Sequence, residues 1–307
     1  IDRGRDRECK QASKQSSKVR RLNQERMKSL FTIQSNVLGR GQVFIGWNAS
    51  ATHLAMVGSN RRVLIYTRQG KIISTLSLQA PGQVVAMEWD SNGEVLAVIQ
   101  KASSEVFFYD LNTKKTDMID VNLKDLTFMK WSHEGQILAI GNAKGSLALY
   151  NLKTLRLVPI KGKHSKKITD GAWNSKNILA LCSDDLNVTL SNEYGDTLTQ
   201  KLTARAPFDL KFSRIKRADS SKSADTTLSA ILDGRSLWLF DSESPNEHPL
   251  ELEFRAEFGA ISSHTWFGDG YILIGFRSGH IVVISTHMDE IGNELSTCKM
   301  VEDVTVV

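Results

Sequence analysis

Histidine and cysteine are common ligands of transition metals, and cysteine can also act as a nucleophile, so their spacing in this 307-residue sequence bears on both kinds of site. The histidines form no HxH or HxxxH pair, which are spacings that bring two imidazoles to one metal ion. They are His53, His133, His164, His248, His264, His280 and His287. The cysteines, Cys9, Cys182 and Cys298, are widely spaced and odd in number, so we expect reduced intracellular thiols rather than a disulfide framework. The sequence therefore predicts no metal and no cofactor.

Other catalytic signatures are also missing from the sequence. The glycines of "LGRGQVFIG" (Gly39, Gly41, Gly46) do not have the dinucleotide-binding spacing and are interpreted as turn residues. No serine lies in a G-x-S-x-G motif, the mark of an α/β-hydrolase nucleophile. The acidic residues mostly occupy turns, and no pair can be placed across a cleft. We predict no catalytic residue and a protein that is not an enzyme.

Two basic stretches are candidate partner-binding loops. "KGKHSKK" contributes Lys161, Lys163, Lys166 and Lys167, and a second polar stretch contributes Arg214, Lys216 and Arg217. Solvated loops are the simplest interpretation of both. The functional alternative is that the lysine-rich loop binds an acidic partner or an anionic headgroup.

A repeat organises the rest of the chain. The stretch "MEWDSNGEVLAVIQ" (Met87–Gln100) returns as "MKWSHEGQILAIGN" (Met129–Asn142), and tryptophans recur every 42 residues at Trp47, Trp89, Trp131 and Trp173. A fifth copy carries "FDLKFS" in place of the tryptophan phrase, and a sixth carries Trp266 followed by "YILIGF". We count six copies.

Each copy predicts four short β-strands, because its apolar phrases are four to seven residues long and bounded by turns such as "SNGE". Four strands per 40–45 residues is typical of a β-propeller blade. The fold class is therefore all-β, a WD-repeat β-propeller with six recognisable blades of four antiparallel strands, interpreted as an incomplete seven-bladed ring. The chain stops before a seventh blade could be completed, so the six blades either close on themselves or leave the ring open.

Burial between blades accounts for the repeated residues. Stacked sheets would remove Trp47, Trp89, Trp131, Trp173 and Trp266 from water, which makes them structural anchors of the repeat. The small Ala of each Leu-Ala phrase is expected near the axis, where inner strands crowd together. The polar insertion Arg214–Thr227 is expected to be an exposed loop.

The basic character of the chain is confined to its start. Residues 1–28 hold ten Lys/Arg against four acids, so this segment carries +6 while the whole chain carries +5. We predict a basic, disordered tail over 1–28 and a partial propeller over 29–307, and no nucleic-acid binding by the propeller. No apolar run approaches the 18–20 residues of a membrane span, so direct membrane insertion is not expected.

Several stretches carry a more specific resemblance. They are "VLAVI" (Val95–Ile99), "SNEYGDT" (Ser191–Thr197) and above all "WFGDGYILIGFRSGHIVVISTH" (Trp266–His287). Over about Met27–His287 the sequence resembles the first propeller of the large two-propeller WD-repeat subunit of intraflagellar transport complex A.

That resemblance implies a non-enzymatic scaffold that supports retrograde ciliary transport, import of membrane-protein cargo and cilium assembly. The implied partners are other complex A subunits and, through the complex, ciliary membrane-protein cargo. The implied location is the cilium, the ciliary base and the cytoplasm. A vesicle-coat or other WD-repeat scaffold is the alternative. A propeller hydrolase would need polar or acidic side chains at the axis, where we expect Leu-Ala-Val/Ile phrases.

One histidine has the position that WD repeats give to a histidine in their residue pattern. His164 precedes Trp173 by nine residues and Asp185 follows in an "SDD" turn, where WD-repeat blades place a hydrogen-bonded His and Asp. Ser191 stands where such a blade has its tryptophan, so only a partial network is expected. We therefore interpret His164 as structural.

Overall fold

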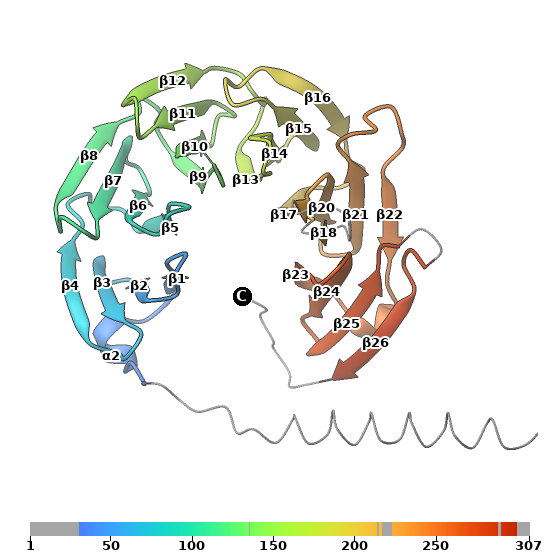
Figure 1. Ribbon diagram of the computed structural model, residues 1–307, viewed down its shortest axis with the longest axis horizontal. Coiled ribbons are helices and arrows are strands. Elements are labelled where there is room, and N and C mark those ends of the chain that lie inside the picture. Colours follow the sequence, from blue (N-terminus) through green and yellow to red (C-terminus); the bar gives the residue numbers. More distant parts are fainter. Residues whose placement is uncertain (1–30, 135, 214, 217–222, 288–289, 300–307) are drawn as a thin grey trace, which may run out of the picture.

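The computed structural model describes residues 31–134, 136–213, 215–216, 223–287 and 290–299. Within them, six four-stranded antiparallel sheets surround a central axis, and the ring is open between the first and the sixth sheet (Figure 1). This confirms the predicted fold class, an incomplete β-propeller. The predicted tail over 1–28 lies outside the described residues.

The strands follow one another in the order of the six repeats. The first three sheets hold β1 (Phe44–Trp47), β2 (His53–Val57), β3 (Arg62–Thr67), β4 (Ile72–Ser77); β5 (Val84–Trp89), β6 (Val95–Gln100), β7 (Glu105–Asp110), β8 (Thr116–Asp120); and β9 (Leu126–Trp131), β10 (Ile137–Asn142), β11 (Leu147–Asn151), β12 (Arg156–Ile160). The last three hold β13 (Ile168–Trp173), β14 (Leu179–Ser183), β15 (Asn187–Ser191), β16 (Thr197–Leu202); β17 (Pro207–Phe212), β20 (Thr227–Leu232), β21 (Ser236–Asp241), β22 (Leu250–Glu253); and β23 (Ile261–Phe267), β24 (Tyr271–Phe276), β25 (His280–Ser285), β26 (Glu294–Lys299). Two short helices, α2 (Ser35–Leu38) and η1 (Ala256–Phe258), lie outside the sheets.

The first strand of each sheet lies nearest the axis and the fourth lies at the rim (Figure 1). The Leu-Ala phrases occupy the second strands, so the expectation that they border the axis is wrong. A second strand is hydrogen-bonded along both edges, and in the second to fifth sheets it has a neighbouring sheet on each face. All six residues of β10 are buried: five are small or aliphatic, and the sixth, Asn142, satisfies its amide by donating to the carbonyl oxygen of Lys124.

Neighbouring sheets share one apolar layer. Between the second and third sheets the ring of Phe108 lies 6.2 Å from Trp131 and 5.7 Å from Tyr150, centroid to centroid. Aliphatic residues such as Ile99 and Leu138 fill the space around them and are fully buried. Burial of this kind contributes about 25 cal/mol per Å² of apolar surface, which explains why each repeat restores the same residue types.

A segment before β1 covers the outer part of the free face of the first sheet. Leu38, at the end of α2, packs against Leu54, Met56 and Leu64, which alternate with the residues that face the second sheet. The chain passes so closely that a Cβ on Gly58 would lie 2.1 Å from the carbonyl oxygen of Leu38. This face is therefore closed by residues 31–43 rather than by a neighbouring sheet.

The described residues of the insertion in the fifth repeat are not all in an exposed loop. Its ends form a two-stranded ribbon, β18 (Ile215–Lys216) and β19 (Ser223–Ala224). Asp225 is buried and accepts hydrogen bonds from the backbone N–H and the hydroxyl of Ser175 in the fourth sheet. The expectation of an exposed loop throughout Arg214–Thr227 is therefore wrong at the end of the insertion. No helix in the described part of the chain is long and apolar enough to cross a membrane.

Candidate functional site

The repeated tryptophans end the inner strands and pair with the start of the second strands, for example Trp89 with Leu96 and Trp173 with Leu179. Trp89, Trp131, Trp173 and Trp266 are between 2% and 8% exposed. Trp47 has the same place in β1 but is 43% exposed, so the expectation that it is removed from water is wrong. The first sheet has no preceding sheet to cover that side of β1.

The indole N–H groups show how each tryptophan meets the preceding sheet. Trp89 Nε1 donates to the carbonyl oxygen of Gly46, and Trp173 Nε1 donates to that of Lys130, both at 3.1 Å. Each acceptor directly precedes the aromatic residue of the previous inner strand. Trp131 Nε1 is buried without a hydrogen-bond partner in the described chain.

Charged side chains lie on the strands nearest the axis, where aliphatic phrases are expected from the sequence. A carboxylate of one inner strand accepts a hydrogen bond from a backbone N–H of the next: Glu88 from Trp131, Asp170 from Leu210 and Asp209 from His264, each at 2.9 Å. Lys130 Nζ also lies 2.6 Å from Glu88 Oε1, and Lys211 Nζ lies 2.9 Å from Asp209 Oδ1. These groups tie neighbouring sheets together near the axis.

Asp170 has the most unusual acidity among these carboxylates. Burial raises its pKa to about 6, against the lowering effect of the N–H donors of Gly171 and Leu210 and of the Lys130 charge. A carboxyl with such a pKa could act as a general acid or base. Here its two backbone hydrogen bonds commit it to joining β13 and β17.

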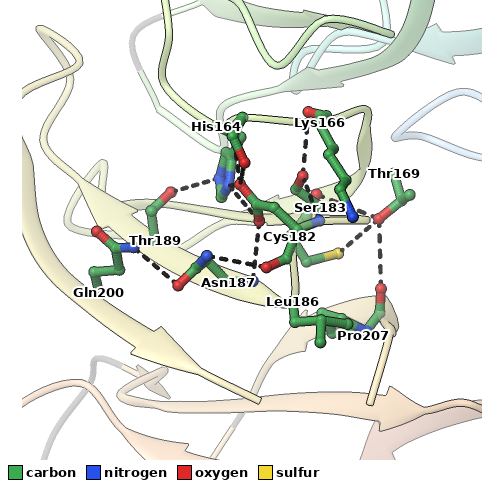
Figure 2. Close-up of polar contacts among 12 residues, drawn as sticks. His164, Lys166, Thr169, Cys182, Ser183, Leu186, Asn187, Thr189, Gln200 and Pro207 are labelled. Atoms are coloured by element: carbon green, nitrogen blue, oxygen red, sulfur yellow. Dashed lines mark hydrogen bonds and ion pairs between the residues drawn. The ribbon is translucent and has the colours of Figure 1, made fainter. Parts of the chain in front are cut away.

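His164 forms the partial network that the sequence predicts (Figure 2). Its Nδ1 lies 3.2 Å from both carboxylate oxygens of Asp185, and its Nε2 lies 3.0 Å from the hydroxyl of Thr189. The network ends there, because the hydroxyl of Ser191 is buried without a hydrogen-bond partner among the described residues. His164 therefore joins the loop before β13 to β15.

The acidities within this network fit a structural contact. Burial lowers the pKa of His164, more than the charge of Asp185 raises it. Burial acts to raise the pKa of Asp185, but the N–H groups of Ser165 and Asn187 together with His164 lower it to about 2. The carboxylate is thus charged at neutral pH and holds the loop through the backbone of Ser165.

A second histidine network, absent from the sequence analysis, joins the fifth and sixth sheets. His264 Nδ1 lies 3.0 Å from Asp209 Oδ2, and His264 Nε2 lies 2.7 Å from the hydroxyl of Ser229. That hydroxyl also accepts a hydrogen bond from Trp266 Nε1 at 2.7 Å and can donate to the carbonyl oxygen of Lys211. Asp209, Ser229 and His264 lie on β17, β20 and β23. Because these strands are far apart along the chain, the spacing of the three residues in the sequence does not predict the contact.

Ser229, His264 and Asp209 have the connectivity of a Ser-His-Asp triad. Burial lowers the pKa of His264, which favours a neutral ring. If Nδ1–H donates to Asp209, Nε2 accepts the single proton of the Ser229 hydroxyl, which is then not donated to the Lys211 carbonyl. Ser229 and His264 are fully buried, however, and the serine oxygen is surrounded by three protein partners. A substrate carbonyl has no approach to that oxygen, so the contact joins two sheets.

The four lysines of the loop before β13 differ in exposure and in hydrogen bonding. Lys161, Lys166 and Lys167 are exposed. Lys163 instead donates from Nζ to the carbonyl oxygen of Gly195 at 2.9 Å and to Thr197 Oγ1 at 2.7 Å, and burial lowers its pKa. Lys163 therefore anchors the loop to the start of β16.

The second candidate partner-binding stretch, Arg214, Lys216 and Arg217, lies largely outside the described residues. Arg214 and Arg217 are not among the described residues, and of Lys216 only its backbone in β18 is described.

A small cavity lies between the fourth and fifth sheets and is bordered by Ile178, Leu190 and Leu198. At about 160 Å³ it has room for one side chain, below the 300–1,000 Å³ of ordinary cofactor sites. No cluster of three His, Cys, Asp or Glu side chains that could hold a metal occurs among residues with a described position.

Known proteins share this sequence and fold. WD repeat-containing protein 19 of Mus musculus is 42% identical over 271 residues, covering 88% of this chain and 20% of that protein. WD repeat-containing protein dyf-2 of Caenorhabditis elegans is 29% identical, covering 84% of this chain and 18% of that protein. The chain thus spans about a fifth of the length of the curated relatives it matches.

Solved structures and a family comparison agree on the architecture. The Saccharomyces cerevisiae Sqt1 structure has a TM-score of 0.70 at 16% identity, covering 85% of this chain and 75% of that one. The C-terminal WD40 domain of Sif2 has a TM-score of 0.62 at 14% identity, covering 79% and 66%. Residues 43–306 match the family described as WDR19 first beta-propeller. The chain belongs to this family of first propellers of WD repeat-containing protein 19.

Proposed function

We propose that this chain is a non-enzymatic scaffold, the first propeller of a subunit of intraflagellar transport complex A. In this proposal it contacts other complex A subunits and supports retrograde transport, import of ciliary membrane-protein cargo and cilium assembly. It acts in the cilium, at the ciliary base and in the cytoplasm, without binding nucleic acid and without inserting into the membrane.

The family match carries this proposal. The 42% identity to WD repeat-containing protein 19 of Mus musculus extends over 271 residues, 88% of this chain, and residues 43–306 match the family of its first propeller. The Sqt1 and Sif2 propeller structures match the same fold at only 14–16% identity. Retained identity of this size favours a shared assembly role over a shared architecture alone.

The chemistry of the interior supports a scaffold. The charged axial residues and the Asp209–Ser229–His264 contact join neighbouring sheets, and the serine is closed to solvent. Propellers of this kind bind through the loops at their rims, where a partner meets several sheets at once.

Affinity purification from ciliated cells tests the proposal. The tagged chain should recover other complex A subunits, while the Sqt1 propeller with the same tag, a control for the fold, should recover none. Recovery of vesicle-coat subunits alone would favour the coat alternative, and recovery of neither set would contradict the proposal.

A panel of ester, peptide and phosphate substrates tests the hydrolase alternative. We expect no turnover above that of the Ser229→Ala variant. Turnover that Ser229→Ala or Asp209→Asn abolishes, in a variant that remains folded by circular dichroism, would show that the buried contact is catalytic.

A further inference from the structure

Three loops on one rim of the propeller are hydrogen-bonded to one another. They are residues 121–125 before β9, residues 143–146 between β10 and β11, and residues 161–167 before β13. In an antiparallel sheet, the turn between the second and third strands lies at the end where the first strand begins. All three loops therefore belong to the same rim of the third sheet.

Backbone contacts fix the three loops. The N–H of Ala143 donates to the carbonyl oxygen of Asp125 at 2.9 Å, and Asn142 Nδ2 donates to that of Lys124 at 3.1 Å. The N–H of His164 donates to the carbonyl oxygen of Gly145 at 2.8 Å. A Cβ on Gly145 would lie 2.1 Å from the carbonyl oxygen of His164, so only glycine allows this approach.

Five exposed lysines project from these joined loops, and we call them the lysine patch. They are Lys124, Lys144, Lys161, Lys166 and Lys167. None of the ion pairs formed by the described residues involves them. Asp125 is the one acidic residue within the three loops. The neighbouring turn brings Asp184 and Asp185 against the loop over 161–167, where Asp185 bonds to His164 and Ser165 and not to a lysine of the patch. The patch thus gathers five lysines on fixed backbone, with net positive charge.

The opposite rim of the same sheets differs in charge. Its turns carry Asp90 and Glu94 in the second sheet, Glu134 in the third, and Glu193 and Asp196 in the fourth. Exposed lysines also occur there, at Lys114, Lys115, Lys153 and Lys176, and Lys71 lies on the same rim of the first sheet. A negatively charged partner would therefore be oriented toward the lysine patch by the field of the propeller itself.

The residue types in the patch select the chemistry of the partner. All five cations are lysines, whereas planar, bidentate recognition of phosphate favours arginine. The three loops contain no Phe, Tyr or Trp for base stacking. Their Val121 and Leu123 are buried, so the loops present no apolar side chain of the kind that anchors interfacial membrane proteins. Carboxylates of a protein fit this surface best.

We propose that the lysine patch binds an acidic segment of a partner protein, rich in Asp or Glu. This inference rests on the proposed scaffold function and names the chemical class of one partner surface. It adds Lys124 and Lys144 to the lysine-rich loop predicted from sequence and assigns Lys163 to holding the loop in place.

Binding of a fluorescein-labelled oligoglutamate peptide to the purified 307-residue chain tests the proposal by anisotropy. The patch variant is Lys144→Glu, Lys166→Glu and Lys167→Glu. The control is Lys71→Glu, Lys115→Glu and Lys153→Glu, three exposed lysines of the opposite rim with the same change in net charge. Residues 1–28 are present in all three proteins, so their charge affects each equally.

We expect the patch variant to bind about tenfold more weakly or worse, and the control to bind as the unchanged chain does. Equal loss in both variants, or loss in neither, would overturn the proposal. Phosphatidylserine vesicles are measured in parallel, and vesicle binding that the patch substitutions abolish, with or without peptide binding, would overturn the choice of a protein partner. The assay contains no other subunit, so its outcome is independent of the purification from cells.

Discussion

Trp47 and Trp173 have the same position in their sheets but different surroundings. Trp173 is covered by the third sheet and donates to the carbonyl oxygen of Lys130, whereas Trp47 faces the open side of the ring and is 43% exposed. Trp131 is intermediate, since it is buried but its N–H has no partner within the described structure. These three residues separate the energetic effect of packing from that of the hydrogen bond.

Replacing each of these tryptophans by Phe should produce graded losses in the free energy of unfolding. We expect about 1–3 kcal/mol for Trp173→Phe, which leaves a cavity and removes the hydrogen bond to the Lys130 carbonyl, and a smaller loss for Trp131→Phe. Trp47→Phe should change the free energy of unfolding by about 0.5 kcal/mol or less. Urea unfolding measures all three, and equal losses at Trp47 and Trp173 would contradict the described packing.

Asp170 should make stability fall as pH rises. Its folded pKa of about 6 lies above the ordinary 3.8, so the folded state holds the proton more tightly than the unfolded chain. The associated stability is full below pH 3.8 and is lost as pH rises through about 6, by at most about 3 kcal/mol. Subtracting the Asp170→Asn curve from that of the unchanged chain isolates this contribution, and a difference independent of pH between 4 and 7 would refute it.

At the scale of elements, side chains hold loops to strands. His164 contacts Asp185 and Thr189, and Lys163 contacts Gly195 and Thr197, so the loop over 161–167 is attached to the fourth sheet at two places. Such contacts convert a lysine-rich loop from a solvated segment into a surface of fixed geometry. Local opening of the loop then requires these hydrogen bonds to break.

Trypsin should detect the loss of one attachment. In His164→Ala we expect cleavage within 161–167 to be about tenfold faster, because the loop opens more often once the contacts to Asp185 and Thr189 are gone. His53→Ala is the control, since the His53 ring is hydrogen-bonded to its neighbour Thr52 and lies far along the chain from the loop. Unchanged cleavage in His164→Ala would show that Lys163 and the backbone hold the loop without the histidine.

At the scale of the whole molecule, the ring has two unlike ends. Residues 31–43 cover Leu54, Met56 and Leu64 of the first sheet, but β1 remains partly exposed. In the sixth sheet, Tyr271 and Leu273 of β24 are only half-buried, while every residue of β10 in the third sheet is buried. In stacked repeats stability depends on the contacts with neighbouring sheets, so the sixth sheet should be the weaker end.

Hydrogen–deuterium exchange of the complete chain should show this difference. We expect the amides of β24 and β25 to exchange at least about tenfold faster than those of β10 and β11, a difference of about 1.4 kcal/mol in local opening. The first sheet should lie between them, because residues 31–43 protect part of it. Uniform protection across all six sheets would indicate a closed ring.

The repeat by itself determined the fold, its six sheets and most of its buried anchors. Tryptophans at intervals of 42 residues, with similar phrases around them, indicate that the same side chains must be buried in each sheet. This requirement can be recognised within a single repeat of the sequence. The partial His164 network was also predictable, because its partners lie in neighbouring strands of one repeat.

Only the tertiary structure decided which strand faces the axis, which end of the ring is open and which charges meet. The Leu-Ala phrases lie one strand away from the axis, and Trp47 is exposed because coverage depends on a neighbour rather than on the residue. Asp209, Ser229 and His264 come from three separate strands, and Lys124, Lys144 and Lys166 come from three separate loops. Contacts between sheets depend on distance in space, which the spacing of residues along one repeat does not encode.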